Sequence, residues 1–525
     1  MPNQPVLVIA LDGYEPSLAV EMAGQGLLPA FQALRERGAY FDLDHGEAKR
    51  TGLAAEHFAT GLDPERAARW SAVNFDAASY GVSQRPTATA PFPAGLAART
   101  VVFDAAYFDL ERAPSVRGVV NWGAHDPGVA AGARPASLHQ EMLARFGPYP
   151  AAEWLYGFVW QSPEKTAAMG QGLARAVDVR AEAAAWLLKE RLPDWDLGLV
   201  MVSESHSAIE ALWHGIDPRH PLHHLASAPV AGQGVRAVYQ AIDRLIGKLT
   251  QACPQAAVVL FSMHGMGSND SDVAGMVLLP ELLYRRAFGR PYMRPRDWES
   301  TVDGVPLLAE DADWHDEMRR LIPDPRSRPA RAFDRLRGRA GDSIDWMPAA
   351  RYRPFWPRMP AFALPSFYDG QIRLNLKGRE AKGMIPLDSY RAAMEGIEAM
   401  LHACRDTVTG QPVVASIQRS PHADPRDLSP SQADLIVIWR GAPLGFDHPE
   451  LGRIGPTPYR RTGGHTGPRG MALIAGEGFT PGQYAPRSAF DMAPTLIDLL
   501  GETPGPDVSG VSALADLAAR RQPRA

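Results

Sequence analysis

The chain contains very little cysteine, since its 525 residues include only Cys253 and Cys404. The two lie far apart in apolar stretches, which predicts neither a disulfide framework nor a thiolate metal site. No apolar run approaches the ~18 residues of a membrane span. The N-terminus enters Val6–Ala10 without the basic region or cleavage site of a secretory signal. We therefore expect a cytoplasmic protein with no membrane partner.

The chain also lacks an excess of positive charge. Its formal net charge is −5, so nothing indicates the basic surface that binds a nucleic acid polymer. The length exceeds one domain of about 150 residues, and the composition changes near residue 288, where Pro, Arg, Trp and Asp accumulate. We predict a first core part over residues 1–287, an inserted peripheral segment over 288–370 and a second core part over 371–525.

What the chain does contain is a series of short apolar runs that end in polar residues. Val6–Leu11 is typical of a parallel strand buried on both faces, and it ends at Asp12. Further strands are predicted at 101–104, 118–121, 197–202, 256–261, 371–376, 433–439 and 471–475, and helices at 18–37, 162–192, 235–252, 389–404 and 489–500. The sequence therefore predicts an α/β fold with a large, mostly parallel central sheet and helices on both faces.

Metal-ligand residue types recur at the ends of these strands and in a glycine-rich loop at 463–468. Because ligands bind outside the carboxyl ends of strands in open α/β sheets, we expect these side chains to converge. Nitrogen-plus-carboxylate sets suit Zn²⁺ or Mn²⁺. Position after the strand favours His206 and Glu210, with Glu204 and His214 as alternatives. The candidate metal ligands are Asp12, Glu204, His206, Glu210, His214, His264 and His465.

Thr51 follows Lys49 and Arg50 and precedes a run of helix formers. Its hydroxyl would lie at a helix N-terminus, where backbone N–H groups and the helix dipole favour an anion. One interpretation is an ordinary N-cap, and the other is a nucleophile that attacks a phosphate and also contacts the metal. The ligand-type residues at distant strand ends favour the nucleophile.

Taken in order, these motifs resemble the alkaline phosphatase superfamily, and within it the type I phosphodiesterase and nucleotide pyrophosphatase branch. The resemblance covers nearly the whole chain. It rests on Asp12-Gly13 after the first strand, Thr51 nine residues before Thr60-Gly61-Leu62, His264-Gly265-Met266, Asn375-Leu376-Lys377-Gly378-Arg379-Glu380, Gly464-His465 and Asp491-Met492-Ala493-Pro494-Thr495-Leu496.

The resemblance implies an alkaline-phosphatase-like fold and a metal-dependent phosphoester hydrolase. The implied substrate is a phosphodiester or pyrophosphate of a small molecule such as a nucleotide. Two divalent ions, Zn²⁺ first and Mn²⁺ second, would activate Thr51 and stabilise the phosphoryl oxygens, and water would cleave a phospho-threonine. Asp12 and His264 would lie on the Thr51 side, while His465 and residues from 204–214 would hold the other ion.

Met263 departs from the family, which has Asp directly before this histidine, and a thioether is a poor ligand for a hard divalent ion. The family's Asp-x-x-x-His pair has no clean counterpart in 204–214 either. One ion site is therefore short of a carboxylate. Two alternatives stay open: a one-metal or altered-site enzyme that transfers a phosphoryl or sulfuryl group, and a degenerate protein that binds a phosphorylated ligand without catalysis. Aromatic candidates for stacking on a base are Tyr292, Trp298, Trp314 and Trp346.

Overall fold

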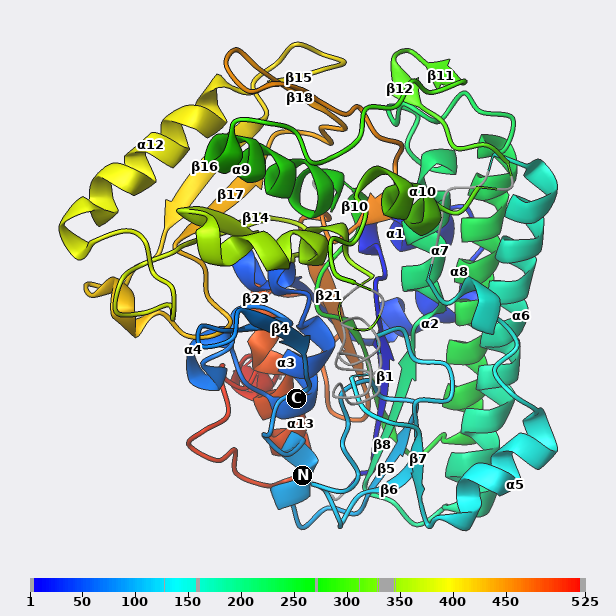
Figure 1. The fold of residues 1–525 in the computed structure, drawn as a ribbon. Coiled ribbons are helices and arrows are strands. Elements are labelled where there is room, and N and C mark those ends of the chain that lie inside the picture. The colour runs from blue at the N-terminus through cyan, green and yellow to red at the C-terminus, as the bar shows by residue number, and fades with distance from the viewer. Residues whose placement is uncertain are drawn as a thin grey trace.

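The structure is a computed structural model that describes residues 4–126, 128–156, 161–269, 272–310, 312–327, 329, 344 and 346–519. Residues 330–343 of the predicted inserted segment lie outside this range. A large mixed sheet forms the centre (Figure 1). Its strand order is β22 (Gly482–Gln483), β2 (Ala39–Asp44), β21 (Gly470–Ala475), β9 (Ala257–Ser262), β1 (Val6–Leu11), β8 (Leu197–Val202), β5 (Thr100–Phe103), β6 (Arg117–Val120) and β7 (Gly132–Arg134), with β23 (Arg487–Ser488) also paired to β2.

The five strands β9, β1, β8, β5 and β6 pair in parallel. Strand β21 runs antiparallel to β2 and β9, and β7 runs antiparallel to β6. The carboxyl ends of the five parallel strands therefore meet at one edge of the sheet. The predicted α/β class with a large, mostly parallel sheet is confirmed, and β1 has the predicted bounds.

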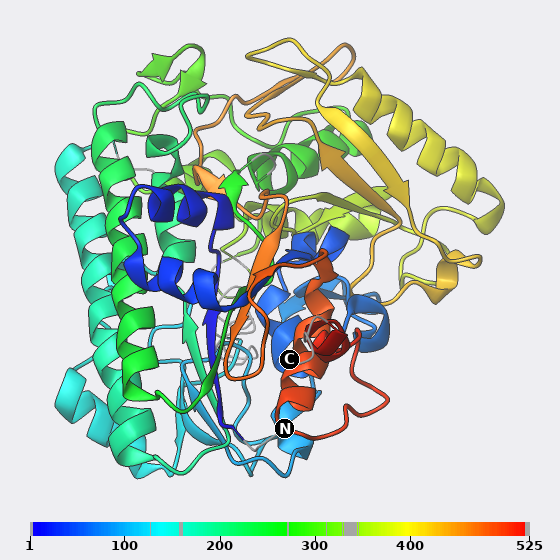
Figure 2. The same cartoon turned by 180° about the vertical axis from the view of Figure 1, so that it is seen from behind.

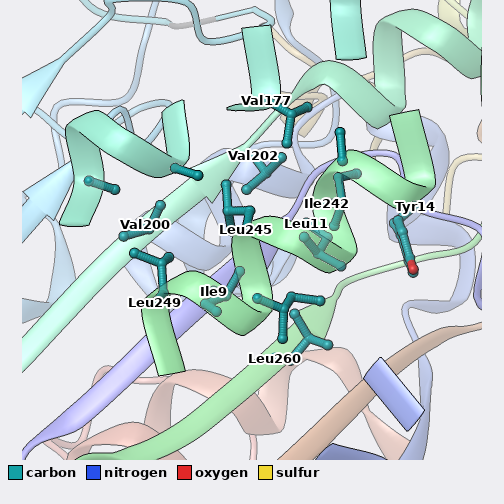
Figure 3. Packing of buried hydrophobic residues seen from close by; sticks show 14 of the residues in the cluster. Ile9, Leu11, Tyr14, Val177, Val200, Val202, Ile242, Leu245, Leu249 and Leu260 are labelled. Carbon is teal, nitrogen blue, oxygen red and sulfur yellow. The ribbon is translucent and has the colours of Figure 1, made fainter. Parts of the chain in front are cut away.

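Helices cover both faces because alternate side chains of each strand point to opposite sides. One face packs on α6 (Pro163–Trp186) and α8 (Ala228–Ala252), which run side by side (Figures 1 and 2). The other face packs on α3 (Ala54–Thr60) and α13 (Met492–Leu499). Figure 3 shows residues of the first face, among them Ile9, Leu11, Val177, Val200, Val202, Ile242, Leu245, Leu249 and Leu260.

The single helix predicted for 18–37 is wrong. The chain forms α1 (Pro16–Gly24) and α2 (Pro29–Arg37) instead. Gly26 takes a left-handed φ of +76°, which ends the first helix. Pro29 then starts the second helix, where its missing N–H costs nothing.

A second apolar cluster lies beside the central sheet, around an antiparallel sheet of β13 (Ala361–Leu364), β14 (Gly370–Leu374), β17 (Leu435–Trp439) and β16 (Val414–Arg419). Helices α9 (Leu279–Phe288) and α12 (Tyr390–Ala403) pack against it, at the upper left of Figure 1. The strands expected at 371–376 and 433–439 are confirmed as β14 and β17. Among the described residues, no helix is both long and apolar enough to cross a membrane.

Candidate metal centre

Five of the predicted site residues converge at the carboxyl edge of the sheet, namely Asp12, His206, Glu210, His264 and His465. Asp12 follows β1, and His206 lies in the first turn of α7 (Glu204–Leu212), which follows β8. Asp12 Oδ2 accepts a hydrogen bond from His206 Nδ1 at 3.0 Å. His206 Nε2 lies 3.2 Å from His465 Nε2, and the rings of His264 and His465 have centroids 4.1 Å apart. Residues from four distant parts of the chain therefore form one cluster.

Two glycines allow these close approaches. Gly13 has a φ of +58°, and a Cβ there would lie 2.6 Å from the Cβ of His206. A Cβ on Gly467 would lie 2.2 Å from the backbone carbon of Gly265, next to His264. The glycine-rich loop and the Asp12-Gly13 turn thus bring backbone against backbone at the site.

The sequence prediction missed His125, which completes the cluster. His125, His206 and Glu210 are buried, and their donor atoms lie within 4.8 Å of one another. In the part of the chain that the structure describes, this is the one group of three or more such residues. The ring of His125 stacks on that of His206 with centroids 4.0 Å apart. A signal was present, because His125 follows the strand predicted at 118–121 by only four residues.

The histidine ring protons point away from the centre. His125 Nδ1 donates to Leu155 O at 2.7 Å, and His465 Nδ1 donates to Lys49 O at 3.3 Å. Because a carbonyl or carboxylate oxygen only accepts, the proton of each neutral ring, His206 included, sits on Nδ1 and leaves a lone pair on Nε2. The lone pairs of His125 and His206 therefore lie close to the Glu210 carboxylate, and His465 Nε2 adjoins that of His206.

This arrangement fits a divalent cation. Zn–N bonds of 2.0–2.1 Å in a tetrahedral site place neighbouring ligand atoms about 3.3 Å apart. The distance from His206 Nε2 to Glu210 Oε1 is 3.3 Å, close to its distance from His465 Nε2. His125 Nε2 and Glu210 Oε2 are buried without a hydrogen-bond partner and lie 3.7 Å apart. Each of these atoms is left with a lone pair that a metal ion would use.

Burial keeps His125 and His264 in the neutral form that binds metal. It lowers the pKa of His125 to about 3 and that of His264 to about 4. Burial acts to raise the pKa of Asp12, but the nearby histidines, His206 above all, outweigh it and lower that pKa. Arg461 donates to Glu210 Oε1 and is itself buried, which lowers its pKa to about 10.

Two predicted alternatives, Glu204 and His214, lie outside the cluster. Both oxygens of Glu204 accept from Arg180 Nε, at 3.0 and 3.1 Å, and Arg180 Nη1 also donates to Asp104 at 2.7 Å. His214 Nε2 contacts Ser227 Oγ at 3.4 Å. Of the carboxylates on α7, the structure brings Glu210 to the centre and leaves Glu204 in a buried ion-pair network.

Thr51 is not the N-cap of the following helix. It ends the short helix η1 (Gly46–Thr51), while Leu53 precedes the first residue of α3. Thr51 Oγ1 donates to Ala48 O at 2.7 Å and accepts from Leu53 N at 3.2 Å. The next residue, Gly52, lines the same 30 Å³ cavity as Asp12, His125, His206 and His465. The Thr51 loop therefore borders the centre.

Met263 supplies no donor to the centre. Its side chain is buried in the apolar cluster on the face of the sheet that includes Phe261. The carboxylate that the sequence lacks at this position is therefore not replaced by the thioether.

The chain matches one protein-family model and is similar to solved structures. Residues 6–320 match the family model described as type I phosphodiesterase / nucleotide pyrophosphatase. Phosphonoacetate hydrolase from Sinorhizobium meliloti 1021, in complex with phosphonoformate, aligns over 95% of this chain and 96% of its own, with 14% identity and a TM-score of 0.51. Murine ectonucleotide pyrophosphatase / phosphodiesterase 5, in complex with AMP, aligns over 98% of this chain and 99% of its own, with 12% identity and a TM-score of 0.44.

No match was found among curated proteins. The likeness to the phosphonoacetate hydrolase shows the fold, which is alkaline-phosphatase-like. The family match covers more than half of the chain and includes Asp12, Thr51, His206 and His264. The chain therefore belongs to the type I phosphodiesterase / nucleotide pyrophosphatase family of phosphoester hydrolases, within the alkaline phosphatase superfamily.

Proposed function

We propose that this chain is a metal-dependent hydrolase of a phosphodiester or pyrophosphate of a small molecule such as a nucleotide, with Thr51 as its nucleophile. The observation that carries the proposal is the convergence of His125, His206 and Glu210 beside the loop of Thr51. Imidazole-rich donor sets suit Zn²⁺ better than Mn²⁺, so Zn²⁺ is the proposed ion. Such an ion would stabilise negative charge on the phosphoryl oxygens.

The chain's own residues set up the nucleophile. Ala48 O and Leu53 N hold the Thr51 hydroxyl at the end of η1. Arg50 anchors this loop through Asp369, with a 2.9 Å ion pair, and Lys49 anchors it through Gly467 O at 3.1 Å. On attack, the Thr51 hydroxyl gives up its hydrogen bond to Ala48 O, and Oγ1 forms a bond to phosphorus. The bond from phosphorus to the leaving-group oxygen breaks, and that oxygen takes the bonding electron pair and the proton lost by Thr51. Water then cleaves the phospho-threonine and restores Thr51.

A second, larger cavity supports an ester substrate with a bulky group. It has a volume of 1130 Å³ and shares Tyr107, Asp126, Phe367 and Arg461 with the small cavity at the metal centre. Ligand pockets of about 300–1,000 Å³ hold drug-sized molecules, so this space exceeds the need of inorganic phosphate. A diester with a sizeable leaving group suits it better than a phosphomonoester of a small alcohol.

One of the four aromatic residues considered from the sequence lines this cavity. Trp346 does so, while Trp314 is buried and donates through Nε1 to Pro458 O at 3.1 Å. Tyr292 and Trp298 pack against the second apolar cluster. Trp346 and Phe367 are therefore the proposed contacts for a planar group of the substrate.

A one-ion enzyme is a second candidate. It is favoured by the presence of only one group of three converging donors in the described residues. Such an enzyme would carry out the same or a related group transfer with one equivalent of metal.

The proposed function is tested with the chelator-stripped protein and an ester panel. Aryl phosphodiester, phosphomonoester, nucleotide pyrophosphate and aryl sulfate are assayed with no metal, Zn²⁺ or Mn²⁺. We expect diester or pyrophosphate hydrolysis that appears only with metal. A fully loaded protein that hydrolyses none of the panel would refute the proposal and favour a non-catalytic binder.

A further inference from the structure

The buried histidines continue beyond the metal centre as a row. Consecutive ring centroids lie 4.0 Å apart from His125 to His206, 4.9 Å from His206 to His465 and 4.1 Å from His465 to His264. The row then continues to His45, 6.0 Å from His264 with the rings nearly parallel, and to His57, 5.3 Å from His45. The first ion accounts for one end of this row. The end formed by His264, His45 and His57 has no role in the mechanism above.

The ring nitrogens at this end are not satisfied within the protein. His45 Nε2 and His57 Nδ1 lie 3.2 Å apart, and one proton between them makes one hydrogen bond. His45 Nδ1 and His57 Nε2 are both buried without a hydrogen-bond partner. The two residues are 3% and 2% exposed, so bulk water does not serve these atoms. A buried polar atom without a partner in the protein is commonly served by a bound water, ligand or ion.

The surroundings point toward a cation. His264 donates its Nδ1 proton to Gly265 O at 3.0 Å, which leaves a lone pair on Nε2. The Asp12 carboxylate interacts electrostatically with His264. The ring of Phe490 packs on both His45 and His57, with centroids 5.2 and 5.5 Å away, and closes the apolar side. Neutral imidazole nitrogens are donors that suit Zn²⁺, and the negative charge of Asp12 nearby favours a cation.

We propose that His45 is a ligand of a second divalent ion, which it holds together with His264 at the edge of the Thr51 loop. His57 is the positioning residue, because His57 Nδ1 accepts a hydrogen bond from His45 Nε2–H, which fixes the ring of His45 and leaves a lone pair on its Nδ1. Histidine ligands commonly have such an outer partner. His45 thus supplies, from the residue just before η1, a donor that Met263 does not provide from the end of β9.

This inference rests on the proposed function only in placing the ion beside Thr51, and its test does not use activity. Chelator-stripped protein is titrated with ZnCl₂ in competition with a chromophoric chelator, and bound zinc is counted after gel filtration. We expect two equivalents for the wild type and one for His45→Gln and for His264→Gln. The double variant should also bind one, because both residues hold the same ion. His214→Gln, a buried histidine outside the row, should bind two.

His57→Gln should still bind two zinc ions, but its affinity for the second should fall about 10–100-fold. Loss of a residue that hydrogen-bonds to a metal ligand has an effect of this size. The one zinc ion that His45→Gln is expected to retain shows that this variant is folded. If His45→Gln does not fold, His57→Gln tests the inference in its place. A wild type with one equivalent, a His45→Gln variant with two unchanged equivalents, or an unaltered His57→Gln would each overturn the inference. One bound equivalent together with ester hydrolysis would reject the second ion and leave the proposed function standing.

Discussion

His206 Nε2 and His465 Nε2 lie 3.2 Å apart although the residues are separated by 259 positions. Each ring gives its Nδ1 proton to an oxygen, so two lone pairs face each other in a buried site. A cation bound by both nitrogens would remove the repulsion between these lone pairs. Binding of a metal ion at this contact leads to the first prediction.

Zinc should stabilise the protein strongly, since the ion binds the folded state only. At a free concentration 1,000 times Kd the gain in the free energy of unfolding is about 4 kcal/mol. The measurement is the melting temperature with ZnCl₂ and with chelator. In His206→Gln, zinc should raise the melting temperature much less than in the wild type. In His402→Gln, which changes an exposed residue, the rise should be unchanged. An equal rise in both variants would show that zinc binds elsewhere.

His125 should be a metal ligand of the same rank as His206, although it carries no recognisable motif. His125→Gln removes the buried Nε2 that lies 3.7 Å from Glu210 Oε2. We expect zinc affinity at the first site to fall at least tenfold, or about 1.4 kcal/mol. Competition with a chromophoric chelator measures it. An unchanged affinity would remove His125 from the ligand set.

Much of this site follows from the sequence, because an apolar run that ends in a ligand-type residue marks both a buried parallel strand and the edge where ligands bind. Asp12 and His264 were found in this way, and His465 was found in the glycine-rich loop at 463–468. Position after the strand favoured Glu210 over Glu204, but the physical reason could not be seen in the sequence, since it depends on Arg180, which reaches Glu204 from another helix. His125 was missed because it lies four residues beyond the predicted strand and not at its end, and its partner Leu155 O becomes adjacent only on folding.

Arg180 should be essential for stability. It is fully buried and joins Asp104, Glu204 and the carbonyl of Gly123, two residues before His125. Arg180→Met would leave two buried carboxylates without a counter-charge, at a cost of about 3–5 kcal/mol. The matched control is Arg244→Met. It breaks an exposed 2.8 Å ion pair with Asp178, which lies on the same helix as Arg180.

The control should cost less than about 1 kcal/mol, because exposed pairs contribute little. Urea unfolding measures both variants. Equal costs for the two arginines would contradict a special role for the buried network. Zinc affinity should fall in Arg180→Met and not in Arg244→Met, since Arg180 positions the segments that carry His125 and His206.

His214 should make the protein acid-sensitive. Burial lowers its pKa to about 3, with His220 adding to the shift, while an unfolded histidine titrates near 6.5. Between these values the unfolded state binds more protons, so stability is present above pH 6.5 and is lost as the pH falls toward 3. The slope is about 1.4 kcal/mol per pH unit for one proton.

His214→Gln should reduce the pH dependence of the free energy of unfolding by up to that slope between pH 4 and pH 6. The comparison is made by urea unfolding of the chelator-stripped protein at several pH values. A variant with the wild-type slope would show that His214 does not titrate on unfolding in this range.

The most direct test of the account is the turnover of an aryl phosphodiester by Thr51→Ala. The matched control is Thr250→Ala, whose hydroxyl likewise donates to a carbonyl of its own helix, Ile246 O at 2.9 Å, but lies on α8 away from the centre. We expect Thr51→Ala to lose at least a thousandfold in kcat while it binds zinc and melts like the wild type, and Thr250→Ala to keep its rate. Full activity in Thr51→Ala would contradict the central claim that Thr51 is the nucleophile.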